Sequence, residues 1–302
     1  MAEERVSVLR QLSDELAALV AQAGSSVVRV EGRPRGGASG LIWSAEGIIV
    51  TADHVLERDE DITVGLPDGQ EVKAALVGRD PATDIALLRI PATGLPPAPL
   101  TESRPPVGHL VLALARPVPG GPMATIGVVS AIGGPWRSRR GSAIEGLIQT
   151  DVTMYPGFSG GPLVGADGLV LGLNTSALVR GLSLTIPTAA LRPLVDALLT
   201  HGRVRRGFLG VSVQVVSLPP ALRDRLGQPT GLLVAGVEPG GPAEQSGVLL
   251  GDVLVALTGQ PLRTLDDLQA ALSGERVGQT VPALVVRAGQ VIEVAVRIGE
   301  RP

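Results

Sequence analysis

Short apolar runs separated by turn residues fill the chain from residue 27 to residue 186. The runs at 48–50, 62–66 and 72–76 are typical of strands, and the segment Pro67-Asp68-Gly69 between two of them is typical of a turn. Many short strands joined by Gly- and Pro-containing turns are the pattern of all-β barrels. We therefore predict a mainly β domain in this part of the chain, built as a pair of barrels.

Two other segments have helical spacing. After Pro187, apolar residues recur three and four positions apart and Gly202 is placed to end a helix; they are Leu191, Leu194, Val195, Leu198 and Leu199. The same spacing near the N-terminus links Leu9, Leu12, Leu16 and Leu19. This spacing predicts an amphipathic helix over residues 1–24 that ends at Gly24.

The segment Tyr155–Leu163, with the sequence YPGFSGGPL, presents Ser159 between glycines. A serine hydroxyl attacks a carbonyl only when a base takes its proton and N–H groups stabilise the resulting oxyanion. Glycines on either side allow the backbone to come close to a substrate. Because 40 of the 302 residues are glycine, the motif carries weight only together with suitable partners upstream.

Two upstream residues supply the matching chemistry. His54 follows the apolar run 48–50, and Asp84 precedes the apolar run 85–88. The order His, Asp, Ser along the chain is that of the chymotrypsin triad, in which histidine is the base and aspartate orients it. Taken singly, the histidine also fits a structural role, and Asp80-Pro81 also fits the start of an ordinary turn. Taken together, the three residues predict a catalytic triad.

The pattern Gly-x-Ser-x-Gly around Ser159 also fits the nucleophile elbow of α/β-hydrolases, in which the acid and the histidine follow the serine. That elbow leads into a helix, whereas residues 163–171 form two short apolar runs around Asp167-Gly168, which predicts a hairpin. The downstream candidates, Asp196 and His201, belong to one helical stretch. The elbow interpretation therefore fails.

Four blocks of sequence together resemble the HtrA/DegP group, which are trypsin-fold serine proteases with a C-terminal PDZ domain. They are residues 51–56, 80–90, 148–163 and 206–211. The resemblance implies a trypsin-like double β-barrel followed by an α+β PDZ domain, with the N–H groups of Gly157 and Ser159 as the oxyanion hole. Phe158 departs from the group, which usually has Asn or Asp there. A bulky apolar residue between these two N–H groups could tilt the loop, and the loss of one such donor would weaken catalysis.

The resemblance also implies the domain limits: a helix at 1–24, a protease domain at 25–201, a linker at 202–206 and a PDZ domain at 207–302. In the PDZ domain the loop that binds a peptide's C-terminal carboxylate would consist of Phe208, Leu209, Gly210 and Val211. The peptide would add as a strand between 209–213 and a helix at 264–273. A core strand without a ligand is the alternative interpretation.

Alignment with the trypsin fold places the substrate pocket at Thr153, Asn174, Thr175 and Leu184. Preference for Lys or Arg depends on an acidic residue at the position of Thr153, and threonine carries no charge. We therefore expect small or medium aliphatic residues at P1. Leu184 fits an ordinary core position equally well.

The expected function is an ATP-independent serine endopeptidase that cleaves unfolded or misfolded proteins, since the chain contains no P-loop Gly-Lys-Ser/Thr motif. Phe158 leaves two alternatives open: a catalytically weak scaffold whose PDZ domain binds C-terminal peptides, and a holdase chaperone. Members of the group form homotrimers, often through N-terminal segments. The helix around 9–19 either serves that purpose or covers its own barrel.

Composition narrows the remaining choices. A formal net charge of −3 gives no electrostatic basis for binding nucleic acid. The chain has no cysteine, and its three histidines are far apart in sequence, so we expect no metal and no cofactor. No segment is apolar enough over a bilayer's thickness to span it, and the acidic N-terminus is unlike a signal peptide. We therefore expect a cytoplasmic protein, or one of the cell envelope if the true start site differs.

Overall fold

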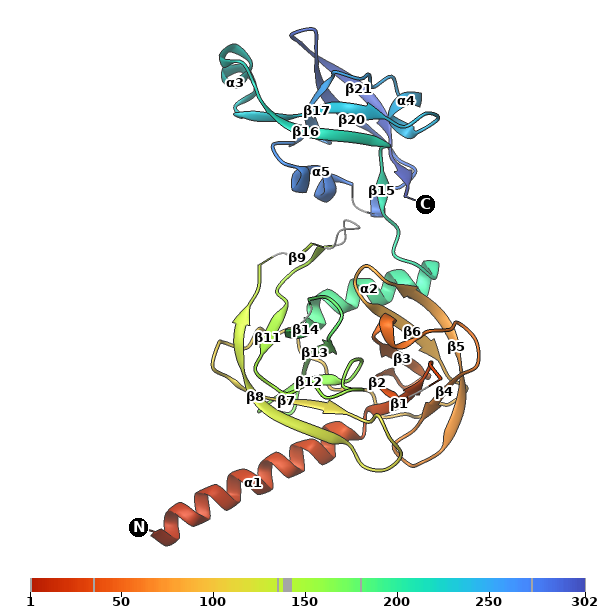
Figure 1. Cartoon of the computed structure of the whole chain (residues 1–302), viewed down its shortest axis with the longest axis vertical. Coiled ribbons are helices and arrows are strands. Elements are labelled where there is room, and N and C mark those ends of the chain that lie inside the picture. The colour runs from red at the N-terminus through yellow and green to blue at the C-terminus, as the bar shows by residue number, and fades with distance from the viewer. Residues whose placement is uncertain are drawn as a thin grey trace. The chain divides into compact units, whose positions relative to one another are not determined.

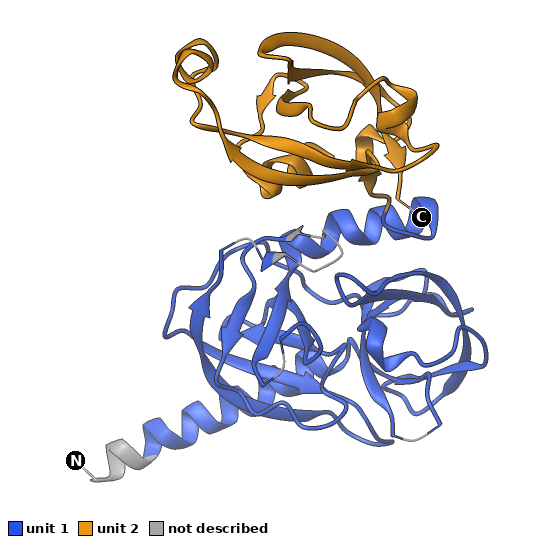
Figure 2. Ribbon diagram, turned by 45° about the horizontal axis from the view of Figure 1, so that its top comes forward, with its two compact units in different colours: residues 1–204 blue, residues 205–302 orange. Residues whose placement is uncertain are grey.

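The computed structural model describes residues 2–34, 36–134, 136–137, 143–179, 181–272 and 274–301. The chain divides into two compact units, residues 1–204 and residues 205–302, which Figure 2 colours separately. Each unit has its own buried apolar clusters. In the part of the chain that the structure describes, no helix is long and apolar enough to cross a bilayer.

The first half of unit 1 is a closed six-stranded barrel with the strand order β1-β2-β3-β6-β5-β4 (Figure 1). Its strands are β1 (Val27–Glu31), β2 (Ala38–Ser44), β3 (Ile48–Thr51), β4 (Ile62–Gly65), β5 (Glu71–Asp80) and β6 (Ile85–Arg89). β3 and β6 pair antiparallel with Thr51 opposite Ala86. The end of β3 therefore lies beside the start of β6, which brings the segments after Thr51 and before Ile85 together.

The second half of unit 1 is a second closed barrel with the order β11-β14-β13-β12-β7-β8. Its strands are β7 (Leu110–Ala115), β8 (Met123–Ile132), β11 (Ile148–Thr150), β12 (Pro162–Gly165), β13 (Val170–Thr175) and β14 (Ser183–Pro187). A small two-stranded sheet of β9 (Trp136–Arg137) and β10 (Ala143–Ile144) lies outside it. The prediction of a mainly β domain made of two barrels is confirmed.

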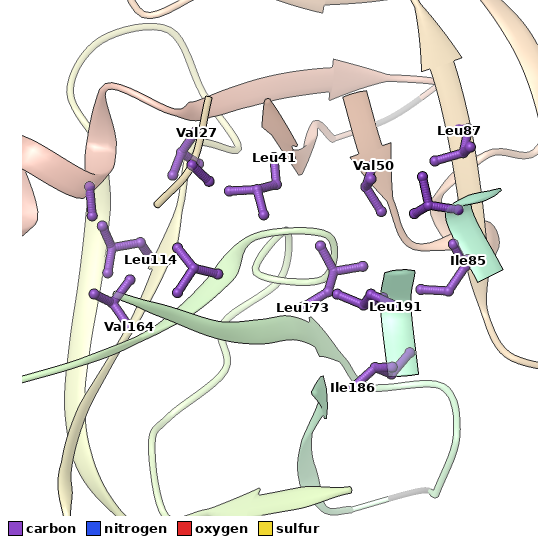
Figure 3. Close-up of a cluster of buried hydrophobic side chains, with 14 of the residues drawn as sticks. Val27, Leu41, Val50, Ile85, Leu87, Leu114, Val164, Leu173, Ile186 and Leu191 are labelled. Carbon is purple, nitrogen blue, oxygen red and sulfur yellow. The ribbon is translucent and has the colours of Figure 1, made fainter. Parts of the chain in front are cut away.

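Apolar side chains from both barrels and from α2 (Thr188–His201) form one buried cluster. In Figure 3, Leu41 and Val50 from the first barrel, Leu114 and Leu173 from the second, and Leu191 from α2 point towards one another. The helix contacts β5 and β6 of one barrel and β13 and β14 of the other, so it fixes the two barrels to each other.

The C-terminal end of α2 confirms the predicted stop. Gly202 has a left-handed backbone with φ of 69°, and its N–H donates to the Leu198 carbonyl, as in a common helix C-cap. A Cβ at Gly78 on β5 would lie 2.3 Å from the Gly202 carbonyl oxygen, so only a glycine in the strand allows this close approach.

The N-terminal helix α1 (Ala2–Gly24) confirms the helix predicted near the N-terminus. Its last turns pack against the buried cluster through Leu16, Leu19 and Val20, and it contacts β7. Leu9 and Leu12, closer to the start of the helix, are exposed. The apolar stripe therefore covers the barrel along only part of its length.

Unit 2 is built on a sheet with the strand order β16-β17-β18-β20-β21, with β19 paired to β18 and a separate pair β15-β22. The strands are β15 (Gly207–Phe208), β16 (Val211–Ser217), β17 (Thr230–Val237), β18 (Val253–Leu257), β19 (Gln260–Pro261), β20 (Thr280–Arg287), β21 (Gln290–Arg297) and β22 (Gly299–Glu300). The helices are α3 (Pro220–Leu226), α4 (Pro242–Gln245) and α5 (Leu265–Ala271), with a 3₁₀ turn at Gly274–Arg276.

The helix expected at 264–273 is α5, which is shorter at both ends. Thr264 is its N-cap, and a reciprocal capping box joins Thr264 to Asp267. Ser273, at the far end of the expected helix, lies outside the described residues. Leu268 is buried in the core of the unit, as its place in the apolar stripe predicts.

Candidate active site

The register of β3 and β6 brings His54 and Asp84 into contact. His54 lies in a 3₁₀ turn, Asp53–Val55, just after β3, and Asp84 directly precedes β6. Nδ1 of His54 is 2.9 Å from both carboxylate oxygens of Asp84, and the backbone N–H of His54 donates to Oδ1 at 2.9 Å. One carboxylate therefore fixes both the imidazole ring and the backbone that carries it.

The carboxylate of Asp84 is buried, with 4% of the side chain exposed. Its backbone is left-handed, with φ of 59°, a region that Asp tolerates better than most residues. The carbonyl of Asp84 accepts a hydrogen bond from the N–H of Asp53 at 3.1 Å, and Oδ2 accepts one from Oγ1 of Thr175 at 2.5 Å. Thr175 ends β13, so this bond joins the second barrel to the first.

The loop before β12 carries Ser159 and depends on its glycines. Gly157 and Gly160 have φ of 92° and 86°, a region that favours glycine. A Cβ at Gly160 would lie 2.0 Å from the carbonyl oxygen of Ser39, and one at Gly157 would lie 2.4 Å from Cβ of Pro117. Both the turn and the close approach to neighbouring segments therefore require glycine here.

Two N–H groups in this loop are open. Neither the N–H of Gly157 nor that of Ser159 donates a hydrogen bond to another described residue. The N–H of Phe158 between them donates to the carbonyl of Tyr155 at 3.1 Å. The two predicted oxyanion-hole donors are thus available to a ligand.

The side chain of Phe158 does not disturb this loop. It is fully buried among apolar residues of the second barrel, including Ala113, Ala115 and Leu163, and its ring meets that of Tyr155 edge-on at 6.0 Å. The ring fills the barrel core, and neither the N–H of Gly157 nor that of Ser159 is paired with a described residue, so these contacts do not indicate a tilted loop.

The hydroxyl of Ser159 is 3.1 Å from the hydroxyl of Ser176. In the described part of the chain, no hydrogen bond joins Ser159 to His54 in this arrangement. Ser176 follows Thr175, so adjacent residues at the end of β13 contact Asp84 and Ser159. Because adjacent Cα atoms are about 3.8 Å apart, His54, Asp84 and Ser159 converge on one small region.

Ser176 belongs to the segment expected to line the substrate pocket, beside Asn174 and Thr175, and no residue pattern indicates its contact with Ser159. A serine just beyond a strand is a common surface feature, and only the folded chain brings it to Ser159. Its hydroxyl is the hydrogen-bond partner of the Ser159 hydroxyl, and either of the two can be the donor.

The residues expected to line a substrate pocket do not share one surface. Thr153 is exposed, whereas Asn174, Thr175 and Leu184 are buried. The amide of Asn174 donates to the carbonyl of Pro162 and accepts from the hydroxyl of Thr185, both at 2.8 Å. Leu184 belongs to the cluster between the barrels. Three of the four side chains therefore contact the protein interior.

The predicted peptide loop of unit 2 forms a turn at the edge of the sheet. Phe208 ends β15, Leu209 is buried, Gly210 is left-handed with φ of 74°, and Val211 begins β16. The N–H groups of Leu209 and Gly210 donate to no other described residue. β16 is the edge strand of its sheet and contacts α5. The free edge of β16 can pair with an added peptide strand.

Two protein-family models match parts of the chain. Residues 38–173 match a trypsin-like peptidase domain, and residues 207–298 match a PDZ domain. The chain is 38% identical over 270 residues to a protein named probable periplasmic serine endoprotease DegP-like from Ectopseudomonas mendocina and, equally, to one of the same name from Halomonas elongata. These matches cover 87% of this chain and 56% of each relative, so the chain spans about half the length of these curated relatives.

Solved structures match over almost the whole chain. The serine endoprotease from Yersinia pestis has a TM-score of 0.78 and 34% identity, covering 94% of this chain and 97% of its own. The HtrA-type protease AlgW, solved with a decapeptide, has a TM-score of 0.79 and 33% identity, covering 95% of this chain and 98% of its own.

The relatives correct one expectation. We expected a cytoplasmic protein, and this is wrong: the curated relatives are named periplasmic, which points to the periplasm or the cell envelope. The expectation rested on the acidic residues near the N-terminus. Those residues belong to α1, and acidic residues in a helix carry no information about targeting.

The two-barrel unit with its His54–Asp84 pair, the PDZ unit and the matches over most of the chain agree with one another. The chain belongs to the HtrA/DegP-like family of trypsin-fold serine proteases that carry a PDZ domain.

Proposed function

We propose that the chain is a serine endopeptidase in which Ser159 is the nucleophile, His54 the general base and Asp84 the residue that orients His54. The observation that carries the proposal is the contact of Nδ1 of His54 with both oxygens of Asp84 at 2.9 Å. Because Asp84 holds Nδ1, the second ring nitrogen, Nε2, is left to accept a proton. The open N–H groups of Gly157 and Ser159 complete the site.

Acylation begins when the hydroxyl of Ser159 attacks the carbonyl carbon of the scissile bond. Nε2 of His54 takes the serine proton, and the negative charge on the former carbonyl oxygen is stabilised by the two open N–H groups. Asp84 stabilises the imidazolium that forms. The imidazolium then protonates the leaving amine, and the acyl group stays on Ser159.

Deacylation repeats these steps with water. Nε2 of His54 takes a proton from the attacking water, the tetrahedral intermediate collapses, and Ser159 recovers its proton as the carboxyl product leaves. Removing one oxyanion donor costs about 10²–10³ in kcat, so the two open N–H groups are an essential part of the site.

We propose unfolded or misfolded proteins as the substrates and peptides with a hydrophobic C-terminus as ligands of the PDZ unit. Thr153 is exposed and uncharged, which favours aliphatic over basic residues at P1. The N–H groups of Leu209 and Gly210 suit a carboxylate, and the free edge of β16 suits an extended chain.

A homotrimer is part of the same proposal. Its support is the apolar surface that α1 leaves exposed at Val8, Leu9 and Leu12, beyond the turns that pack on the barrel. Light scattering on the purified protein would give the mass. A mass of one chain that persists at high protein concentration would rule the trimer out.

The test of the enzyme is digestion of casein by the wild type beside Ser159→Ala and the control Ser103→Ala, each with and without a peptide that ends in a hydrophobic residue. Ser103 is exposed and remote in sequence from the motif, so its variant controls for the loss of a serine. Cleavage by the wild type and Ser103→Ala, and none by Ser159→Ala, is the expected result. No cleavage by any of the three would favour the scaffold or the holdase.

A further inference from the structure

Ser39 on β2 touches the Ser159 loop from the first barrel and is fully buried. Its hydroxyl donates to the carbonyl of Gly157 at 2.7 Å, and its backbone N–H donates to the carbonyl of Ser159 at 3.2 Å. One residue of the first barrel therefore holds the carbonyls of both residues whose N–H groups are open.

The direction of the hydroxyl of Ser39 is determined by its neighbours. The backbone N–H of Arg116 donates to this hydroxyl at 2.8 Å. A backbone N–H only donates and a carbonyl only accepts, and a hydroxyl has a single proton. The proton of the Ser39 hydroxyl must therefore point to the carbonyl of Gly157, so Ser39 is the donor and Gly157 the acceptor in this bond.

Arg116 is itself fixed in place. Its guanidinium is buried and donates to the carbonyls of Val27 at 2.7 Å, of Gly24 at 2.9 Å and of Gly120. The first two carbonyls lie on β1 and at the end of α1. Ser39 is held too, because Oγ1 of Thr51 donates to its carbonyl at 2.7 Å. The support behind the loop is therefore rigid.

These contacts act on the peptide group between Gly157 and Phe158, which lies between the two oxyanion donors. The carbonyl of this peptide is held by Ser39, and its N–H is held by the carbonyl of Tyr155. A peptide group is planar, so fixing both ends fixes its rotation. The relative direction of the Gly157 and Ser159 N–H groups is thereby set before a substrate arrives.

We propose that Ser39 is a positioning residue for the oxyanion hole, acting through the carbonyl of Gly157. The proposal rests on the endopeptidase function. Preorganised donors contribute to catalysis because they need no reorientation as charge develops. Ser39 touches neither substrate nor reacting atoms, so its loss should affect stabilisation of the transition state and leave ground-state binding unchanged.

The test compares Ser39→Ala with the wild type on a chromogenic peptide and on two inhibitors, a peptide boronate and the corresponding product peptide. The boronate forms a tetrahedral anion on Ser159, and the product peptide does not. For Ser39→Ala we expect kcat to fall by about 10- to 100-fold. This fall is no larger than the fall in kcat expected on removing one oxyanion donor, about 10²–10³-fold. Boronate affinity should fall by a similar factor, while KM and product affinity should stay within about twofold.

A matched control is Thr188→Val, which removes another buried hydroxyl, one that donates to the carbonyl of Val170 at 3.2 Å and is remote from the loop. It should leave kcat unchanged. Ser39→Cys keeps the shape of the side chain with a weaker donor and should give an intermediate kcat. This variant still tests the proposal if Ser39→Ala does not fold.

Three results would overturn the proposal. An unchanged kcat in Ser39→Ala, or an equal loss of affinity for the boronate and the product peptide, would leave Ser39 with a structural role only. If Ser39→Ala does not fold and Ser39→Cys is as active as the wild type, Ser39 again has a structural role only. An inactive wild type would overturn the endopeptidase function together with this inference, whereas an active wild type separates the two.

Discussion

At the scale of single residues, the buried carboxylate of Asp84 depends on a hydroxyl from the other barrel. We predict that Thr175→Val lowers kcat/KM by about tenfold or more, since hydrogen bonds to charged groups contribute about 1.5–3 kcal/mol. The loss arises because Oδ2 of Asp84 is then buried without the Thr175 donor and holds His54 less firmly. Hydrolysis of a chromogenic peptide measures the change, with Thr188→Val as the control for a lost buried hydroxyl.

Phe158 gives a second prediction at this scale. Replacing it with Asn, the residue usual in the family, should destabilise the protein by about 3–5 kcal/mol, the cost typical of removing a buried aromatic ring. It should not raise activity, because the ring lies in the barrel core and not among the oxyanion donors. Urea unfolding and peptide hydrolysis test both statements. Phe158→Leu keeps the apolar character and should lose less stability.

The motif and the order of residues along the chain predict that His54, Asp84 and Ser159 act together, and the structure brings His54 into contact with Asp84. The contacts around these three residues could not be predicted in the same way. Thr175 was expected in a substrate pocket, and its hydroxyl donates to Asp84; Phe158 was considered as a residue that could tilt the loop, and its ring packs in the core. The Thr175 contact crosses from the second barrel to the first, and the ring of Phe158 turns into the core of its own barrel. Periodicity in one segment carries no information about the segment on the other side.

At the scale of elements, strands and helices were predictable and their pairing was not. Apolar runs such as 48–50 coincide with strands, and Gly202 ends α2 as expected. The pairing of β3 with β6, which brings His54 to Asp84, skips two strands of the chain order. No local pattern determines such a pairing, because it follows from closing the barrel as a whole.

In unit 2, an ion pair between a buried carboxylate and a half-buried guanidinium joins the residue before β18 to the end of β20. The guanidinium of Arg287 donates to Oδ1 and Oδ2 of Asp252 at 2.8 and 2.7 Å, and the N–H of Leu249 donates to Oδ2 at 2.8 Å. Burial opposes ionisation of Asp252, but these hydrogen bonds outweigh it and keep the pKa of the carboxyl below its ordinary value.

The sign of the pH effect follows from this lowered pKa. The carboxylate stabilises the fold above its unfolded pKa of about 3.9, and the contribution disappears as pH falls through the lower, folded pKa. Asp252→Asn should therefore lower the stability of unit 2 by about 2 kcal/mol near neutral pH, and by less as the pH falls below the unfolded pKa of about 3.9. Calorimetry of the full chain across this range is the measurement. Glu293→Gln, an exposed change on β21, should show no such dependence.

At the scale of the whole molecule, the site is confined to one unit. His54, Asp84 and Ser159 lie within residues 1–204, together with the partners Thr175 and Ser39. The resemblance predicted a protease domain and a PDZ domain, and the apolar clusters of each unit explain why either can hold its shape. The resemblance predicted the order of the domains. The contacts that each residue of the site makes could be known only from the folded chain.

This confinement leads to a prediction about the truncated chain. Residues 1–204 alone should hydrolyse a small chromogenic ester with kcat/KM within about twofold of the full chain, because independent sites perturb each other by no more than about 0.3–0.5 kcal/mol. Stimulation of casein cleavage by a hydrophobic C-terminal peptide should disappear, since the N–H groups of Leu209 and Gly210 are removed. The truncated Ser159→Ala variant is the control for background hydrolysis. If the truncated chain is folded by circular dichroism and yet inactive on the ester, the site depends on unit 2 and its confinement to residues 1–204 is disproved.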